Sequence, residues 1–274
     1  MNDHSVKSWF LGFRQRPLER IRLFCFPYAG GGSVIYRQWS TKLPREVNVV
    51  PVELPGRGSR LLEPAFRNLP ALIDELLGAI TPLLGNDYAL FGHSMGALIA
   101  FELARALRRR QLNQPRHIFV AGRRAPQIPT TDPLTYSLPL PGFTDELKKL
   151  NGTPKEVLDH PELMQVVLPA LRADFELVQT YKYEADQPLE CPITVYGGTQ
   201  DIKVPPEALL PWREQTNAQC KIHMLKGDHF FLRSAEFRLL TLLRQEMMEM
   251  ISTTSRLLQR RREEKFLRKQ QVDS

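Results

Sequence analysis

The stretch Gly92-His93-Ser94-Met95-Gly96 is the part of the sequence whose residue types and spacing most clearly suggest chemistry. It fits the G-x-S-x-G pattern, in which a serine occupies a sharp turn between a strand and a helix, so that its hydroxyl can attack a carbonyl carbon. The apolar run before the turn and the helical spacing after it provide this context. Ser94 is therefore the candidate nucleophile, and the N–H of Met95 is the expected donor to a developing oxyanion. His93 adjoins the nucleophile, and we expect its side chain to point elsewhere.

A run of three glycines follows an earlier apolar stretch, in the segment PYAGGGS at 27–33. Glycine lets a backbone approach a ligand closely. In enzymes with this serine pattern, the corresponding loop supplies the second oxyanion N–H. We expect that donor to be Ala29, with Gly30 as the alternative.

A serine nucleophile needs a base, and the base needs an acid that fixes its tautomer. His229 is the best placed of the six histidines, because it lies in a loop just after a predicted strand. Asp201 also follows a predicted strand, and the chain order Ser94, Asp201, His229 is that of α/β-hydrolases. Asp228 is a rival acid, but as the immediate neighbour of His229 it is poorly placed to bond the imidazole.

Strand-like and helix-like stretches that would position these residues alternate along the chain. Several strand candidates are apolar at both odd and even positions, which is typical of strands covered by helices on both faces. This order predicts an α/β protein with a mostly parallel, doubly wound sheet and with ligands beyond the carboxyl ends of its strands. The predicted strands are 21–26, 47–53, 87–91, 117–122, 193–198 and 220–225, and the predicted helices between them are 68–84, 95–110 and 204–216.

A long segment between the fourth and fifth predicted strands exceeds what one crossover helix needs. It begins with a proline-rich stretch and continues with helical spacing at 144–151, 153–160 and 161–183. We expect a helical lid over residues 123–188, inserted into a single domain of residues 1–252; a small packing subdomain is the alternative. The insertion contains Asp132 and Asp174, which are weaker rivals to Asp201.

The composition is that of a soluble globular protein, with 42% hydrophobic and 24% charged residues. No stretch approaches the ~20 apolar residues of a membrane span, and the start MNDHSVKSWFLGF lacks the long apolar run of a secretory signal. The three cysteines form no C-x-x-C pair, so zinc and dithiol sites are not expected. We therefore expect a cytoplasmic monomer that uses neither a metal nor an organic cofactor.

The net charge of +7 is concentrated near the C-terminus. Residues 256–269 carry seven Lys or Arg and two Glu, a charge of +5, so that the other 260 residues carry only +2. Because the body is nearly neutral, nucleic acid is not an expected partner. Residues 253–274 are interpreted as a separate basic tail. This tail is either a solvated or disordered extension, or a basic helix that contacts nucleic acid, an anionic membrane or an acidic protein.

Six segments extend the pattern around the candidate site: FCFPYAGGG, VELPGRGSR, FGHSMGALIAFELAR, LPALRADFELVQTYKY, CPITVYGGTQD and GDHFFL. Together they resemble the type II thioesterases that accompany nonribosomal peptide and polyketide synthetases, from about residue 17 to about residue 250. The resemblance implies an α/β-hydrolase fold with a helical lid. It also implies hydrolysis of acyl or aminoacyl thioesters from the phosphopantetheine arm of acyl or peptidyl carrier proteins, the arm being part of the substrate. Carried over by motif, Ser94, Asp201 and His229 would be nucleophile, acid and base, with Ala29 and Met95 as oxyanion donors.

The sequence departs from that family at two places. Asp228 stands where the family often has glycine, and a carboxylate beside the base could alter its pKa or the local loop. The basic tail has no counterpart in the family. Arg57, in PGRGSR, belongs to the family pattern without a role that the sequence explains. Three further arginines are candidates to meet the phosphate or an acidic carrier surface: Arg123, Arg124 and Arg172.

Other functions would use the same candidate residues. A medium-chain acyl-carrier-protein thioesterase that terminates fatty acid synthesis, or a general esterase, would have the same triad. A non-catalytic carrier-binding protein with the hydrolase fold would be expected to have lost part of it. Macrocyclising thioesterases are disfavoured, because they normally end a much longer synthetase.

Overall fold

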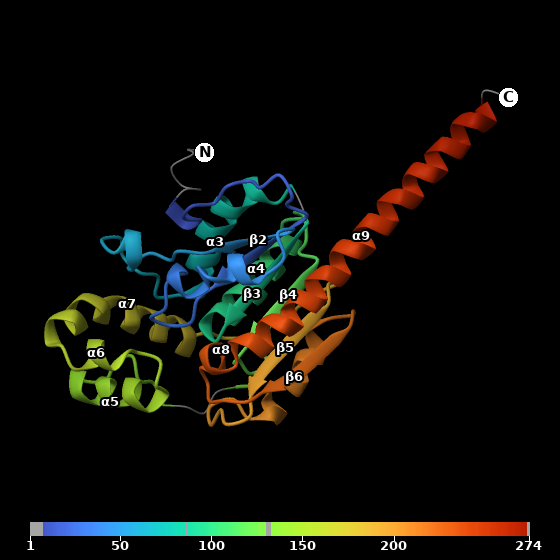
Figure 1. Ribbon diagram of the computed structural model, residues 1–274. Coiled ribbons are helices and arrows are strands. Elements are labelled where there is room, and N and C mark those ends of the chain that lie inside the picture. Colours follow the sequence, from blue (N-terminus) through green and yellow to red (C-terminus); the bar gives the residue numbers. More distant parts are fainter. Residues whose placement is uncertain (1–7, 86, 130–132, 273–274) are drawn as a thin grey trace.

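Six parallel strands form the central sheet of this protein, whose computed structural model describes residues 8–85, 87–129 and 133–272 (Figure 1). The strand order is β2-β1-β3-β4-β5-β6, and every neighbouring pair is parallel. The predicted parallel sheet of an α/β-hydrolase fold is thereby confirmed. The strands are β1 (Ile21–Phe26), β2 (Val47–Pro51), β3 (Tyr88–His93), β4 (His117–Ala121), β5 (Ile193–Gly198) and β6 (Cys220–Leu225).

Alternate residues of the strands enter two different apolar clusters, one on each face of the sheet. Within β1, Phe24 and Phe26 pack on one face, whereas Leu23 and Cys25 pack on the other. Helices α3 (Leu69–Ile80) and α4 (Met95–Arg109) cover the first face. Helices α2 (Trp39–Lys42), α8 (Phe231–Ser234) and the first part of α9 (Glu236–Val272) cover the second. Burial on both faces explains why β1, β3, β4 and β5 lack a polar side in the sequence, whereas the edge strand β6, with Lys221 and His223, is mostly only partly buried.

Proline explains where the predicted helices differ from the observed ones. The stretch predicted as a helix at 204–216 contains three prolines and forms two short 3-10 helices, η4 (Pro206–Ala208) and η5 (Leu210–Gln215). The helix predicted at 68–84 ends at Ile80 and continues as the 3-10 helix η3 (Thr81–Leu83), in which Pro82 has no N–H to donate. Near the chain start lie two further 3-10 helices, η1 (Ser33–Tyr36) and η2 (Gly58–Arg60).

The inserted segment forms three helices, α5 (Leu140–Leu150), α6 (Lys155–Leu158) and α7 (Pro161–Gln179), which lie together to one side of the sheet (Figure 1). The predicted helix start at 144 is wrong, because α5 already begins at Leu140 with a proline in its first turn, where proline is well tolerated. Phe143 and Leu147 of α5 and Met164 and Leu171 of α7 form a small apolar core. Val157 and Leu158 of α6 pack against it.

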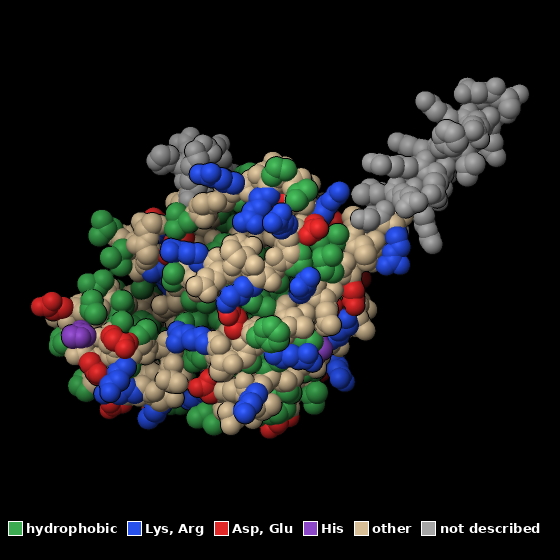
Figure 2. All heavy atoms as spheres, in the orientation of Figure 1, with side chains coloured by type: hydrophobic (Ala, Val, Ile, Leu, Met, Phe, Trp, Pro, Cys, Tyr) green, Lys and Arg blue, Asp and Glu red, His purple; other side chains and the backbone are tan. Residues whose placement is uncertain are grey.

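The basic tail continues α9 as one helix to Val272, and its C-terminal part projects away from the body (Figure 1). For residues 255 and 257–272 the structure describes the backbone and not the side chains. On the face that Figure 2 shows, Lys and Arg side chains of the body are scattered and interspersed with acidic ones. Among the described helices, none combines the length and the apolar character needed to cross a membrane.

Candidate active site

Ser94 lies on the turn between β3 and α4, with the backbone conformation of a nucleophile elbow. Its φ is 53°, a positive value that a non-glycine residue rarely adopts, and its N–H donates to the carbonyl of Ala121 at 2.8 Å. Such strain persists only where the surroundings impose it, and it clusters at functional positions. The turn thus holds the Ser94 side chain beyond the carboxyl edge of the sheet.

The two glycines of the pentapeptide are required by close backbone approaches. A Cβ at Gly92 would lie 2.0 Å from the carbonyl oxygen of Gly96, and a Cβ at Gly96 would lie 2.1 Å from that of Phe26. Neither backbone atom can move aside without displacing the elbow or β1. The glycine spacing seen in the sequence is therefore a packing requirement of the turn.

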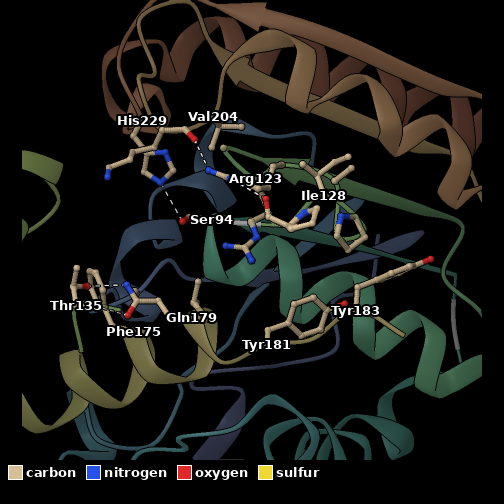
Figure 3. A pocket seen from close by; sticks show the side chains of 18 of the residues that line it. Ser94, Arg123, Ile128, Thr135, Phe175, Gln179, Tyr181, Tyr183, Val204 and His229 are labelled. Carbon is tan, nitrogen blue, oxygen red and sulfur yellow. Dashed lines mark hydrogen bonds between the residues drawn. The ribbon is translucent and has the colours of Figure 1, made fainter. Parts of the chain in front are cut away.

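The structure brings Ser94, His229 and Asp201 together at this edge, and Figure 3 shows His229 directed toward Ser94. His229 Nε2 lies 3.0 Å from Ser94 Oγ, and His229 Nδ1 lies 2.8 Å from Asp201 Oδ2. Asp201 follows β5 and His229 follows β6, so both loops leave the carboxyl ends of adjacent strands. Ser94, His229 and Asp201 thereby form one hydrogen-bonded chain, although Asp201 and His229 lie 107 and 135 positions after Ser94 in the sequence.

The surroundings of Asp201 fix the tautomer of His229. The Asp201 side chain is fully buried, and its other oxygen accepts the N–H groups of Lys203 at 2.9 Å and Val204 at 3.1 Å. A carboxylate accepts hydrogen bonds and donates none, so the proton of His229 lies on Nδ1. Nε2 is then available to accept the Ser94 hydroxyl proton.

The glycine loop and the start of α4 contain the two N–H groups that the sequence predicts as oxyanion donors. Among the described residues, no acceptor takes the N–H of Ala29 or that of Met95. The N–H of Gly30, the alternative donor, is bonded to Asp174 Oδ2 at 2.7 Å. Of the two candidates in the glycine loop, Ala29 is therefore the one with an available N–H.

The rival acids have other contacts. Asp228 turns toward the insertion: Oδ1 accepts the N–H of Phe230 at 2.8 Å, and Oδ2 lies 3.4 Å from Asn151 Nδ2. Asp174 pairs with Arg57. Asp132 lies outside the described residues.

His93 is a neighbour of the base that the sequence did not indicate. It is fully buried, its Nε2 donates to the carbonyl of His229 at 2.9 Å, and its ring meets the His229 ring at an angle of 67°. Burial, with smaller contributions from neighbouring charges, holds the pKa of His93 well below its usual range. His93 is thus a neutral side chain that supports the loop of His229. The G-H-S spacing was visible in the sequence, but the partner lies 136 residues away and no local pattern predicts it.

A cavity of about 510 Å³ opens beside Ser94 and His229 (Figure 3). Its walls come from the loop after β4, from α5, from α7 and the segment that follows α7, and from the loop after β5. Most of the lining side chains are apolar, and amides and charged groups lie among them. Among the lining residues are Ile128, Phe175, Val178, Tyr181, Gln127, Gln179, Arg123 and Glu146.

Arg124 and Arg172, two arginines singled out in the sequence, form hydrogen bonds within the protein. Arg124 donates to the carbonyl of Lys203 at 2.9 Å, and Arg172 donates to the carbonyls of Tyr136 and Leu138 while its guanidinium lies over Phe143. Arg123 lines the cavity. The structure therefore gives Arg124 and Arg172 internal roles that the sequence alone did not indicate.

Comparisons with known proteins agree with this geometry. A model of the thioesterase domain family matches residues 21–246. The gramicidin S biosynthesis protein GrsT of Aneurinibacillus migulanus is 43% identical over 235 residues, which cover 86% of this chain and 92% of that protein. The solved structure of BorB, a type II thioesterase from the borrelidin biosynthetic cluster, superimposes with a TM-score of 0.79. BorB is 30% identical in sequence, and the match covers 87% of this chain and 97% of BorB.

A medium-chain thioesterase is also similar to this chain. The S-acyl fatty acid synthase thioesterase, medium chain, of Rattus norvegicus is 34% identical over 229 residues, which cover 80% of this chain and 84% of that protein. Its identity is lower than that of GrsT, over a comparable length. The chain therefore belongs to the thioesterase family, within which it is similar to the type II thioesterases of natural-product pathways.

Proposed function

We propose that this protein hydrolyses acyl or aminoacyl thioesters from the phosphopantetheine arm of carrier proteins, and so clears stalled or misloaded modules of a nonribosomal peptide or polyketide synthetase. The observation that carries the proposal is the hydrogen-bonded chain Ser94–His229–Asp201 on a strained elbow, in a member of the thioesterase family. A non-catalytic scaffold would not need this arrangement.

The first half of the reaction forms an acyl-enzyme. His229 Nε2 takes the hydroxyl proton of Ser94 while Oγ attacks the thioester carbonyl carbon. The N–H groups of Ala29 and Met95 stabilise the oxyanion. The C–S bond then breaks, and His229 returns the proton to the departing pantetheine thiolate. Asp201 stabilises the imidazolium that exists between these two transfers.

The second half releases the acyl group as a free acid. A water molecule loses a proton to His229 Nε2 and attacks the ester carbonyl carbon. The same two N–H groups stabilise the second oxyanion. The C–Oγ bond then breaks, and His229 returns the proton to Ser94. The cycle consumes one water and leaves the carrier with a free thiol.

The insertion acts as a lid in this proposal. Phe175 and Gln179 on α7 line the cavity beside Ser94, so a movement of α7 would change access to the nucleophile. The higher sequence identity to GrsT than to the medium-chain thioesterase favours the housekeeping role over the termination of fatty acid synthesis.

The proposed partner is a carrier protein, and the proposed enzyme is a cytoplasmic monomer without a cofactor. Two carbonyl-directed N–H groups and one histidine suffice for both steps. Among the residues that the structure describes, no three His, Cys, Asp or Glu side chains lie together as potential metal ligands. Activity that persists in excess EDTA is the expected result, and light scattering in solution tests the monomer.

A substrate panel tests the proposed role. Holo-carrier proteins loaded with acetyl, aminoacyl and C8–C12 acyl groups are each incubated with the enzyme, and the released acids are quantified. Efficient release of acetyl and aminoacyl groups is expected. A marked preference for C8–C12 chains would instead assign the protein to medium-chain termination, and activity on simple esters alone would indicate a general esterase.

A further inference from the structure

Three buried side chains form hydrogen bonds with backbone groups of the glycine loop that contains Ala29. Asp174 Oδ2 accepts the N–H of Gly30 at 2.7 Å, Arg57 Nη1 donates to the carbonyl of Gly31 at 3.2 Å, and Glu53 Oε2 accepts the N–H of Ser33 at 3.2 Å. The exposed fractions of Asp174, Glu53 and Arg57 are 2%, 2% and 9%. Fixed, desolvated groups therefore define the path of this loop.

Asp174 and Arg57 form a two-point ion pair across two distant segments. Nη1 lies 2.6 Å from Oδ2 and Nη2 lies 2.8 Å from Oδ1, while the guanidinium also donates to the carbonyl of Pro55. Burial by itself would lower the pKa of Arg57, but the charge and hydrogen bonds of Asp174, with the charge of Glu53, leave that pKa raised. A buried pair of this kind is weak evidence for stability, because apolar replacements are often as stable. Stability alone therefore does not explain why a charged pair occupies this buried position.

Helix α7 touches the glycine loop at two points one turn apart. Asp174 holds the Gly30 N–H, and Leu171 packs so closely that a Cβ at Gly30 would lie 2.4 Å from its Cδ2. The φ of Gly30 is +76°, a value suited to glycine. The insertion therefore contacts the backbone of the residue that directly follows the oxyanion donor Ala29.

We propose that Asp174 and Arg57 are positioning residues of the oxyanion hole, through which helix α7 sets the direction of the Ala29 N–H. This inference rests on the proposed function. Asp174 accepts the Gly30 N–H and so fixes the peptide plane between Ala29 and Gly30, and Arg57 donates to the carbonyl of Gly31. Arg57 also balances the charge of Asp174, which would otherwise repel an oxyanion at the neighbouring N–H. The Ala29 N–H then points toward the oxyanion only when α7 is in place against the glycine loop.

The test separates positioning from stability. The double variant Arg57→Met/Asp174→Leu replaces the ion pair by apolar groups, and the single variant Asp174→Asn keeps the shape and one acceptor. Each is assayed with an acyl N-acetylcysteamine thioester for kcat and KM, with a trifluoromethyl ketone analogue for Ki, and by thermal unfolding for Tm. The matched control is Glu19→Gln, which alters the buried Glu19–Arg22 pair at the opposite edge of the sheet.

For the double variant we expect a folded protein with a lowered Tm, because the buried carbonyls of Gly31 and Pro55 lose their donor. We also expect kcat to be lowered at least about tenfold with KM little changed, because a misplaced oxyanion donor acts on the transition state. The Ki of the ketone, which forms a tetrahedral oxyanion adduct on serine, should rise in parallel with the loss of kcat/KM. Asp174→Asn should lose less activity than the double variant, and Glu19→Gln should lose none.

Unaltered kcat and Ki in folded Arg57→Met/Asp174→Leu would overturn the inference. If that variant does not fold, unaltered values in folded Asp174→Asn, in which Arg57 is left without its counter-charge, would overturn it equally. A KM effect alone would also contradict it, since that would place Asp174 in ground-state binding. Absence of thioesterase activity in the unaltered protein would instead refute the proposed function, so the two failures are distinguishable.

Discussion

At the scale of single residues, the site depends on which carboxylate supports the base. Asp201 is fully buried and bonds His229 Nδ1, whereas Asp228 bonds the N–H of Phe230 and faces Asn151 of the insertion. Asp201, which follows the neighbouring strand β5, bonds His229, whereas Asp228, which is adjacent to His229 in the sequence, does not bond its ring. The direction of the side chain decides between the two, and it becomes visible only once the strands are assembled.

The two aspartates give a direct comparison. Asp201→Asn should lower kcat by about a thousandfold to ten-thousandfold, because the amide favours the wrong histidine tautomer. Asp228→Asn keeps the side chain's shape and an acceptor for the N–H of Phe230, so kcat should change little. Steady-state kinetics on one thioester substrate measures both variants, and a larger loss in Asp228→Asn than in Asp201→Asn would reverse the assignment.

Buried histidines make the stability of the protein depend on pH. His117 is buried beside Thr194, and burial, with a smaller effect of Lys221, lowers its pKa to about 3. The unfolded chain binds a proton near pH 6.5 and the native chain does not, so His117 stabilises the fold fully above pH 6.5 and less as pH falls. The loss is about 1.4 kcal/mol per pH unit below that value.

The variant His117→Gln isolates this contribution. Between pH 7 and pH 5 its free energy of unfolding should fall by about 2 kcal/mol less than that of the unaltered protein. Urea denaturation at the two pH values provides the measurement, with the surface residue His160 replaced by Gln as the control. Equal falls in the unaltered protein and in His117→Gln would show that the imidazole is not held neutral.

At the scale of elements, the turn that contains Ser94 brings the end of β3 very close to the start of α4. A Cβ at Gly92 would meet backbone atoms of Gly96, whereas a Cβ at Gly78, in α3, meets nothing within 4 Å. Gly92→Ala should destabilise the fold by more than about 3 kcal/mol or prevent folding. Gly78→Ala should stabilise it by about 0.5 to 1 kcal/mol, because alanine favours a helix interior. Thermal and urea unfolding measure both, and a folded, active Gly92→Ala would contradict the described packing.

The sequence predicted regular elements better than it predicted contacts between them. The periodicity of 95–110 and the apolar runs of the strands carry their own signal, so α4 and all six strands were located to within two residues. Prolines that end or begin a helix were harder to interpret, as at 204–216 and at Leu140. The pairing of Arg57 with Asp174 joins residues 117 positions apart, and no spacing rule connects them. The sequence shows that both residues are charged, but it does not show that they form an ion pair. That contact depends on how the insertion packs on the glycine loop.

At the scale of the whole molecule, the basic C-terminal part of α9 is separate from the site. It projects from the body (Figure 1), while Ser94 lies at the carboxyl edge of the sheet. Beyond Ser252, the described contact with the body is the bond from Thr254 Oγ1 to Asp87 Oδ2 at 2.9 Å. The tail is therefore expected to contribute little to hydrolysis.

Truncation after Ser252 tests this separation. The kcat and KM on a small thioester should be unchanged, and the free energy of unfolding should fall by about 0.5 to 1.5 kcal/mol for the lost hydrogen bond. Kinetics and urea denaturation of the truncated and full chains provide the comparison. If truncation lowers the hydrolysis of carrier-bound substrate but not that of the small thioester, the tail contacts the carrier. The tail would then contribute to carrier binding and not to the chemical steps at Ser94.

The central claim is that Ser94 removes acyl groups from the phosphopantetheine arm of a carrier protein. The most direct measurement follows an acetyl-loaded carrier by intact mass spectrometry, with the unaltered enzyme and with Ser94→Ala. The unaltered enzyme is expected to return the carrier to its free-thiol mass, and Ser94→Ala is expected to leave it loaded. Deacylation by Ser94→Ala at the rate of the unaltered enzyme would contradict the account.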